Sequence, residues 1–251
     1  MCTLVILRRP GHRWPVLIGA NRDEMIDRPW KPPGRHWPDR PEVVAGLDIL
    51  AGGSWLGIND WGVAAAVLNR RGSLGPSPDR RSRGELVLEA LDHADAATAA
   101  EALSYLDPTA YRTFNLIIAD DRDGFWLRHV GGKPVEKRPL KDGLSMIAAG
   151  EIDDLATRRI ELALPAFREW PVPEPDSEDW AAWASLLASP RVPRGEPATA
   201  AMRFCTEGYG TVSSALIALP TRNEPDRRPI FRFAAWQPES TPWRSIPIEA
   251  V

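Results

Sequence analysis

The 251-residue sequence contains only two cysteines, Cys2 and Cys205, and four histidines. Two cysteines cannot build the disulfide framework of a small secreted protein. The histidines are scattered along the chain without the spacing of a metal site. No apolar run approaches the ~20 residues that a membrane-spanning helix requires. We therefore expect neither a membrane span nor a metal site.

A surplus of charge is also missing. The formal net charge is −3 and the pI is about 5.9, which gives no reason to expect nucleic-acid binding. Basic charge comes from 27 arginines and only four lysines. Arginine suits fixed ion pairs and carboxylate recognition, but a GC-rich genome produces the same bias, and we favour that explanation.

The N-terminus lacks the pattern of a secretory signal peptide. Its apolar run is only Leu4 to Leu7, and Arg8 and Arg9 follow this run instead of preceding it. We expect a cytoplasmic protein. Its hydrophobic fraction of 43% and charged fraction of 26% are ordinary for a globular chain. The length is sufficient for one large core, so we predict a single domain over residues 1–251.

The chain begins with a thiol directly after the initiator methionine. Because the Cys2 side chain is small, we expect Met1 to be removed, which leaves a thiol and an α-amino group on one residue. An α-amino group titrates near ~7.7–8.0 and a thiol near ~8.5. The amine can therefore act as the base for its own thiol, as in an N-terminal nucleophile. A buried structural cysteine is the alternative.

A polar run, residues 21–24, follows the second apolar run of the chain. The pattern predicts strands over 2–8 and 14–20, joined by a turn at 9–13, so the polar run would close the strand beside Cys2. The Asp23 carboxylate could then hold the α-ammonium group and orient the nucleophile. The alternative is a charged turn in which Arg22 and Glu24 make surface ion pairs.

Apolar periodicity and turn signals predict the remaining elements. Residues 27–42 contain five prolines and should form an extended, irregular loop that either covers a pocket or packs on the body. Ser82 and Glu85 form a capping box before an amphipathic helix. Strands are expected over 47–51, 54–58, 62–68, 113–119, 125–130, 134–139, 144–149, 211–219 and 229–236, and helices over 83–93, 96–106, 153–164 and 177–188. This order predicts an α+β fold in which helices cover both outer faces of two stacked sheets.

Five sequence blocks resemble the NRDE family, whose animal members are called transport and Golgi organisation proteins. The family is similar in turn to the N-terminal-nucleophile hydrolases, particularly the cysteine acylases that cleave bile-salt and penicillin amides. The resemblance implies their four-layer αββα sandwich, and animal members are associated with haem handling. The blocks are Cys2 and residues 21–24, 53–59, 69–71 and 209–214.

The resemblance also suggests roles for individual residues. The acylases carry an Arg-Asn-x-Asp stretch, whose Asp matches Asp23 but whose Arg position is Ala20 here. We expect Arg22 to point to the opposite face of the strand and not to replace that arginine. Asn69 matches an oxyanion-binding Asn, although it can equally be a turn residue. A second oxyanion Asn has no counterpart in residues 146–151.

Two functions are consistent with these observations. Our main hypothesis is an amidohydrolase acting on a small amide or acyl substrate, with Cys2, Asp23 and Asn69 as catalytic residues and no required cofactor. The alternative is a non-catalytic protein that uses the same cleft to bind or carry haem or an acyl ligand. Both imply a small-molecule partner and leave the oligomeric state open. The expected substrate-binding residues are Asn21, Arg22, Glu24, Trp55, Arg70 and Thr211.

Overall fold

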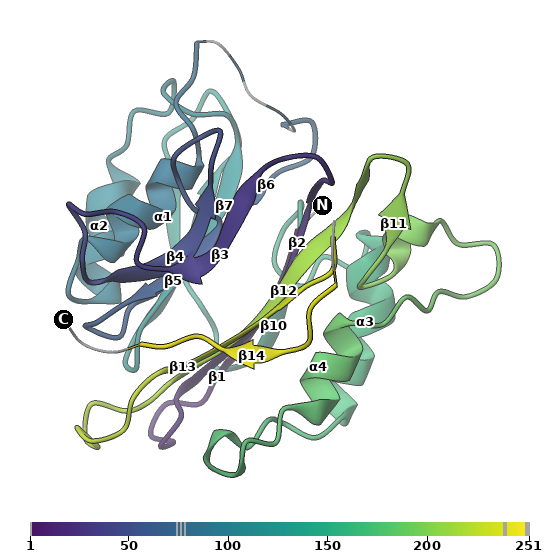
Figure 1. Ribbon diagram of the computed structural model, residues 1–251. Helices are drawn as coiled ribbons and strands as arrows, with labels where there is room; N and C mark the ends of the chain where they lie inside the picture. Colours follow the sequence, from purple (N-terminus) through teal and green to yellow (C-terminus); the bar gives the residue numbers. More distant parts are fainter. Residues whose placement is uncertain (1, 74, 76, 78, 238–239, 249–251) are drawn as a thin grey trace.

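Two antiparallel β-sheets are stacked face to face, and helices cover both outer faces (Figure 1). This computed structural model describes residues 2–73, 75, 77, 79–237 and 240–248. Helices α1 (Gly84–Leu91) and α2 (Ala96–Ser104) pack on one sheet, and α3 (Arg158–Glu169) and α4 (Ala181–Leu187) pack on the other. The predicted four-layer αββα sandwich is confirmed.

The first sheet contains the N-terminal strand at an interior position. Neighbouring strands are antiparallel throughout. In spatial order the strands are β10 (Gly143–Ile147), β1 (Thr3–Arg8), β2 (Val16–Met25), β12 (Tyr209–Leu219), β13 (Ile230–Ala235) and β14 (Arg244–Ser245), with β11 (Cys205–Thr206) paired to β12.

The second sheet follows the chain without crossovers, because each strand pairs antiparallel with the next. Its strands in order are β3 (Trp30–Gly34), β4 (Val43–Asp48), β5 (Leu56–Asn59), β6 (Ala64–Asn69), β7 (Phe114–Ala119), β8 (Gly124–His129) and β9 (Glu136–Pro139). Two short 3-10 turns, η1 (Pro175–Ser177) and η2 (Ala198–Ala200), lie between α3 and β11.

Three apolar clusters account for the layers. One fills the space between the sheets and contains Leu4, Ile18 and Ile117. The second joins the β4–β9 sheet to α1 and α2, and the third joins the β1–β2 sheet to α3 and α4. Side chains of a strand alternate between its two faces, so each buried strand contributes to the central cluster and to one outer cluster.

Strand β2 is longer than predicted, and this changes the setting of the polar run. The expected strand over 14–20 continues to Met25, so residues 21–24 lie inside a strand and not after one. The reason is that the side chains facing the helix layer find buried partners. Asn21 Nδ2 donates to the carbonyl oxygens of Leu187 and Met202 at 2.9 and 2.7 Å. On the other edge of β2, pairing with β12 extends to Met25 opposite Tyr209.

Strand β3 corrects the expectation of an irregular loop over 27–42. Residues Trp30 to Gly34 pair with β4 despite Pro32 and Pro33. Proline lacks a backbone N–H and is tolerated on a sheet edge, and β3 is the edge strand. The predicted strand at 47–51 is also wrong, because β4 ends at Asp48, whose carbonyl accepts from Gly52 in a tight turn.

Two helices begin later than predicted, and in both cases a left-handed residue precedes them. Asp153 and Glu178 have φ of 54° and 57°, a conformation that an α-helix cannot contain. Helix α3 therefore begins at Arg158 and continues through Pro165 instead of ending there, because its apolar face is buried on the sheet.

The expected capping box at the start of α1 is wrong as well: Ser82 Oγ accepts from the Gly84 amide, and Glu85 pairs with Arg81.

Candidate functional site

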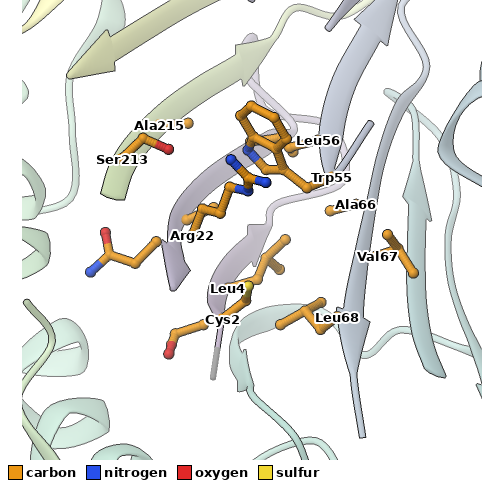
Figure 2. Close-up of a pocket in the computed structure, with 13 residues that line it drawn as sticks. Cys2, Leu4, Arg22, Trp55, Leu56, Ala66, Val67, Leu68, Ser213 and Ala215 are labelled. Atoms are coloured by element: carbon orange, nitrogen blue, oxygen red, sulfur yellow. The ribbon is translucent and has the colours of Figure 1, made fainter. Parts of the chain in front are cut away.

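The pairing of β1 with β2 brings Cys2 next to Arg22. Thr3 lies opposite Asn21 and Leu4 lies opposite Ala20. Cys2 directly precedes Thr3, so the same register places Cys2 opposite Arg22. Cys2, Ala20 and Arg22 line one narrow recess between the sheets (Figure 2). The prediction that Arg22 points away from this face is wrong. Ala20 and Arg22 are two residues apart, so the alternation of a strand places both on the same face.

The Arg22 guanidinium is buried beside the thiol and only partly satisfied. Its carbon lies 4.1 Å from the centroid of the Trp55 ring, and Nη2 donates to Asp48 Oδ2 at 3.1 Å. The side chain is 3% exposed. Burial lowers the pKa of Arg22, but an arginine remains protonated. Nη1 is buried and has no hydrogen-bond partner among the described residues.

Arg28 shares the two acidic groups, Asp48 and Glu24, that face Arg22. Arg28 makes a two-pronged contact with Asp48, at 2.6 Å from Nε to Oδ2 and 3.1 Å from Nη2 to Oδ1. The Glu24 carboxylate lies 3.8 Å from Arg22 and from Arg28. Asp48 and Glu24 together supply two carboxylates for Arg22 and Arg28, and the contacts of Glu24 are the longer ones.

Asp23 faces the other side of β2 and belongs to a buried ion pair. Arg159 Nη1 donates to Asp23 Oδ2 at 2.6 Å, and the Thr211 hydroxyl donates to Oδ1 at 2.8 Å. Arg159 also donates to Thr3 Oγ1 at 2.9 Å and to the Thr199 carbonyl oxygen. The pair therefore ties β1, β2 and β12 to helix α3.

A β-bulge in β12 distributes the hydroxyl groups of the Tyr209–Ser214 block over two faces. The register shifts at Val212, so that Thr211 lies opposite Asp23 and Ser213 lies opposite Arg22. Without the extra residue, Thr211 and Ser213 would share one face. The bulge instead keeps Thr211 at the buried carboxylate and brings Ser213 into the recess that Cys2 lines.

The Cys2 thiol is held in its protonated form. Burial raises its pKa, and the nearby charge of Asp23 raises it further. The sulfur lies 3.6 Å from the backbone oxygen of Asp23, and the Tyr209 hydroxyl donates to the same oxygen at 3.4 Å. Tyr209 is thus a second hydrogen-bonding group beside the thiol, and burial raises its pKa too. A thiol in this state needs a base before it can act as a nucleophile.

The recess opens into a larger cleft of about 550 Å³. One wall comes from β2 and the β4–β5 turn, and the other comes from the chain around the start of α1. Its lining residues include Cys2, Arg22, Asp23, Glu24, Arg28, Asp48, Trp55, Asn69, Arg80, Arg83, Arg112 and Tyr209.

The structure brings together most, but not all, of the residues singled out from the sequence. Cys2, Arg22, Asp23, Glu24, Trp55 and Asn69 line the cleft. Three others point elsewhere. Arg70 donates to Asn115 Oδ1 and pairs with Glu151. The Asn21 and Thr211 side chains are buried on the helix side of the sheet.

Sequence reasoning missed several neighbours of the thiol. Tyr209 and Ser213 lie in a block already singled out, but the bulge that orients Ser213 leaves no sequence signal. Asp48 and Arg159 approach from distant parts of the chain and have no motif of their own. The prediction for Arg22 was wrong because positions 20 and 22 are two residues apart and therefore share a face of the strand.

The histidines do not supply a haem ligand to this cleft. His12 accepts from the Trp14 amide, His36 contacts the Pro32 oxygen, and His129 is buried away from the site. Among the described residues no group of three or more His, Cys, Asp or Glu side chains could hold a metal ion. Cys2 would be the only thiol in the cleft for a haem iron, and its pKa favours the protonated form. Tyr209, which also lines the cleft, is a further side chain of a type that binds haem iron.

Several solved structures share the fold of this chain. Penicillin V acylase from Agrobacterium tumefaciens matches with a TM-score of 0.60 and 18% identity, over 93% of this chain and 83% of that chain. A Caenorhabditis elegans ortholog of N-acylethanolamine-hydrolyzing acid amidase matches with a TM-score of 0.60 and 13% identity, over 90% and 96%. A mutant conjugated bile acid hydrolase from Clostridium perfringens gives 0.56 and 12%, over 98% and 92%.

The chain belongs to the Transport and Golgi organisation 2 family, whose model matches residues 1–226. The mouse Transport and Golgi organization 2 homolog is 38% identical over 115 residues, which are 42% of this chain and 38% of the mouse protein. The human homolog is 39% identical over a segment of the same length. The matched segment thus spans well under half of these relatives. The family and fold predicted from the sequence are confirmed.

No helix in the described part of the chain is long and apolar enough to cross a membrane.

The buried Arg159–Asp23 pair predicts a large effect on stability. Replacing Arg159 with Leu leaves an uncompensated buried carboxylate and should lower the free energy of unfolding by about 3–5 kcal/mol. Arg158→Leu is the matched control, because Arg158 is its exposed neighbour and pairs with Glu161 and Glu196 at the surface. That change should cost no more than about 1 kcal/mol. Urea unfolding followed by circular dichroism measures both, and equal losses would contradict the structural role of Arg159.

The acidic groups near Cys2 predict a pH effect on thiol reactivity. Negative charge disfavours the thiolate, so Asp23→Asn should lower the pH at which alkylation of Cys2 is half-maximal. Glu24→Gln should lower this midpoint by a smaller amount, because Glu24 contributes less to the raised pKa. Iodoacetamide labelling across pH, mapped to Cys2 by mass spectrometry, gives the midpoints. An unchanged or higher midpoint in both variants would show that these charges do not act on the thiol.

Proposed function

We propose that this chain is an N-terminal cysteine hydrolase that cleaves a small amide or acyl compound. One observation carries the proposal: Cys2 and Arg22, whose Nη1 has no hydrogen-bond partner among the described residues, both line a cleft large enough for a substrate. A nucleophile and a hydrogen-bond donor for the developing oxyanion are the two groups that acyl transfer requires.

The base comes from Cys2 itself once Met1 is removed. Met1 lies outside the described residues, so this step rests on the sequence. The β1–β2 register sets Cys2 opposite Arg22, which directs its backbone nitrogen toward the Asp23 end of β2. The Asp23 carboxylate stays bound to Arg159 and Thr211 and stabilises the α-ammonium group through its charge. The raised pKa of the thiol makes such a base necessary, because little thiolate is present without one.

The proposed reaction has two steps, acylation of Cys2 and hydrolysis of the resulting thioester. The thiol proton passes to the α-amine while sulfur bonds to the substrate carbonyl carbon, and the resulting oxyanion accepts hydrogen bonds from Arg22 Nη1 and the Asn69 amide. The C–N bond then breaks, and the leaving amine takes the proton from the α-ammonium. In the second half, water gives a proton to the α-amine and attacks the thioester carbon. The C–S bond then breaks, the acid is released, and the sulfur takes the proton from the α-ammonium group to restore the thiol. No cofactor is needed.

Arg22 takes the part that the sequence comparison left vacant at Ala20. Because the two residues share a face of β2, an arginine reaches the nucleophile from a position two residues further along the strand. This removes one of the two differences from the acylase pattern, the missing arginine at position 20. The other remains: the carbonyl group of the substrate has Arg22 and Asn69 as donors, with no second Asn from residues 146–151.

The structural relatives share the fold that this proposal requires, and they do not define a substrate. The structural relatives are an acylase, an acid amidase and a bile acid hydrolase. At 12–18% identity their likeness supports the fold alone. A reactive thiol also calls for a reducing compartment, so we propose a cytoplasmic location.

A second function, binding an acyl ligand without cleaving it, is favoured by the raised pKa of Cys2. If the thiol stays protonated, the same cleft holds its ligand through Arg22 and the apolar walls of the recess. The apolar lining comes from Leu4, Leu56, Ala66, Leu68 and Ala215.

Intact-mass spectrometry with an activated ester such as p-nitrophenyl acetate separates the two functions. The hydrolase predicts loss of Met1, a burst of one acetyl adduct that maps to Cys2, and slow turnover. Cys2→Ala should abolish the adduct, while Cys205→Ala, which removes the other cysteine, should retain it. Arg22→Met should slow acylation roughly 10²-fold, the typical effect of one lost oxyanion donor. A retained Met1 and an unmodified Cys2 would leave ligand binding as the function.

A further inference from the structure

The cleft wall opposite Cys2 is rich in arginine. Arg80 and Arg83 precede helix α1, and Arg112 precedes strand β7. The same wall includes Gly84, the first residue of α1, where the helix dipole adds positive potential. The nucleophile thus faces a positively charged surface across the cleft.

The charge of Arg83 has no acidic partner among the described residues. Its Nη1 donates to the Ser73 carbonyl oxygen at 2.7 Å, to Ser73 Oγ at 2.8 Å and to the Thr113 carbonyl oxygen at 3.1 Å. These neutral acceptors fix the guanidinium without neutralising it. Burial, and next the charge of Arg112, lower the pKa of Arg83 to about 10. The Arg83 guanidinium is therefore a cation that neutral acceptors hold in place and that the charge of Arg112 repels.

Arg80 is held in the same way, and Arg81 shows the contrast. Arg80 donates to the backbone oxygens of Thr109 and Tyr111. Arg81 is instead neutralised at the surface by Glu85 and Glu89. Arg81 therefore has two carboxylate partners, whereas Arg80 and Arg83 make no ion pair within 4 Å among the described residues. Like charges held together by backbone oxygens are costly unless an anion accompanies them.

We propose that Arg83, with Arg80 and Arg112, forms a subsite for an anionic group of the substrate, a carboxylate or a phosphate. An anion held there lies across the cleft from the thiol. The substrate class is therefore an acyl or amide compound with an anionic head, whose acyl part enters the recess at Cys2. This inference deepens the proposed function and rests on it for the acyl step alone, because anion binding is measured separately.

Binding is tested with inorganic pyrophosphate and with succinate by isothermal titration calorimetry, using Cys2→Ala so that no covalent chemistry contributes. Pyrophosphate or succinate should bind Cys2→Ala and the unmodified chain equally. Adding Arg83→Gln should weaken binding at least tenfold, and Arg80→Gln should weaken it by a smaller factor. Arg13→Gln is the control, because it removes the same charge from the loop between β1 and β2, at the far end of these strands from Cys2.

Tighter pyrophosphate binding identifies a phosphate head, and tighter succinate binding identifies a carboxylate head. Arg83→Lys retains the charge, so it should keep part of the affinity and serves if Arg83→Gln fails to fold. The proposal is overturned if neither anion binds, or if Arg13→Gln weakens binding as much as the cleft variants do. Anion binding without an acyl adduct at Cys2 would refute the hydrolase and leave the subsite standing.

Discussion

The antiparallel pairing of β2 with β1 and β12 is the constraint on which the site depends. It keeps the polar run of residues 21–24 in an extended strand, where successive side chains must point to opposite faces. Asn21 and Asp23 therefore face the helix layer and bind buried partners there, while Arg22 and Glu24 face the cleft. Four consecutive polar residues thus divide into two that stabilise the sheet and two that line the cleft.

The same division explains how a charged cleft is compatible with a stable protein. The Asp23 charge is matched by Arg159 inside the structure, so its burial does not depend on a ligand. Arg22 shares the carboxylates of Asp48 and Glu24 with Arg28, whereas Arg83 is held by neutral oxygens. Buried cations that lack full compensation raise the energy of the empty cleft and favour a bound anion or a developing oxyanion.

Much of the fold could be predicted from the sequence, because apolar runs and turn residues mark most of its elements. The thiol at position 2 was also readable, since its place after Met1 needs no structural information. Three features were not readable. Strand β3 is hidden by prolines that only an edge position tolerates, and the bulge at Val212 leaves no local pattern. The contact of Arg159 with Asp23 joins residues 136 positions apart and forms only when α3 packs on the sheet.

A crystal structure of the acylated protein tests the central claim most directly, namely that the register of β2 presents Arg22 to the group reacting at Cys2. The account predicts an acyl group on the sulfur, with its carbonyl oxygen about 2.7–3.2 Å from Arg22 Nη1. The Asp23 carboxylate should remain bound to Arg159 on the other face of the strand. An acyl oxygen directed away from Arg22, with Nη1 still lacking any contact, would contradict the account.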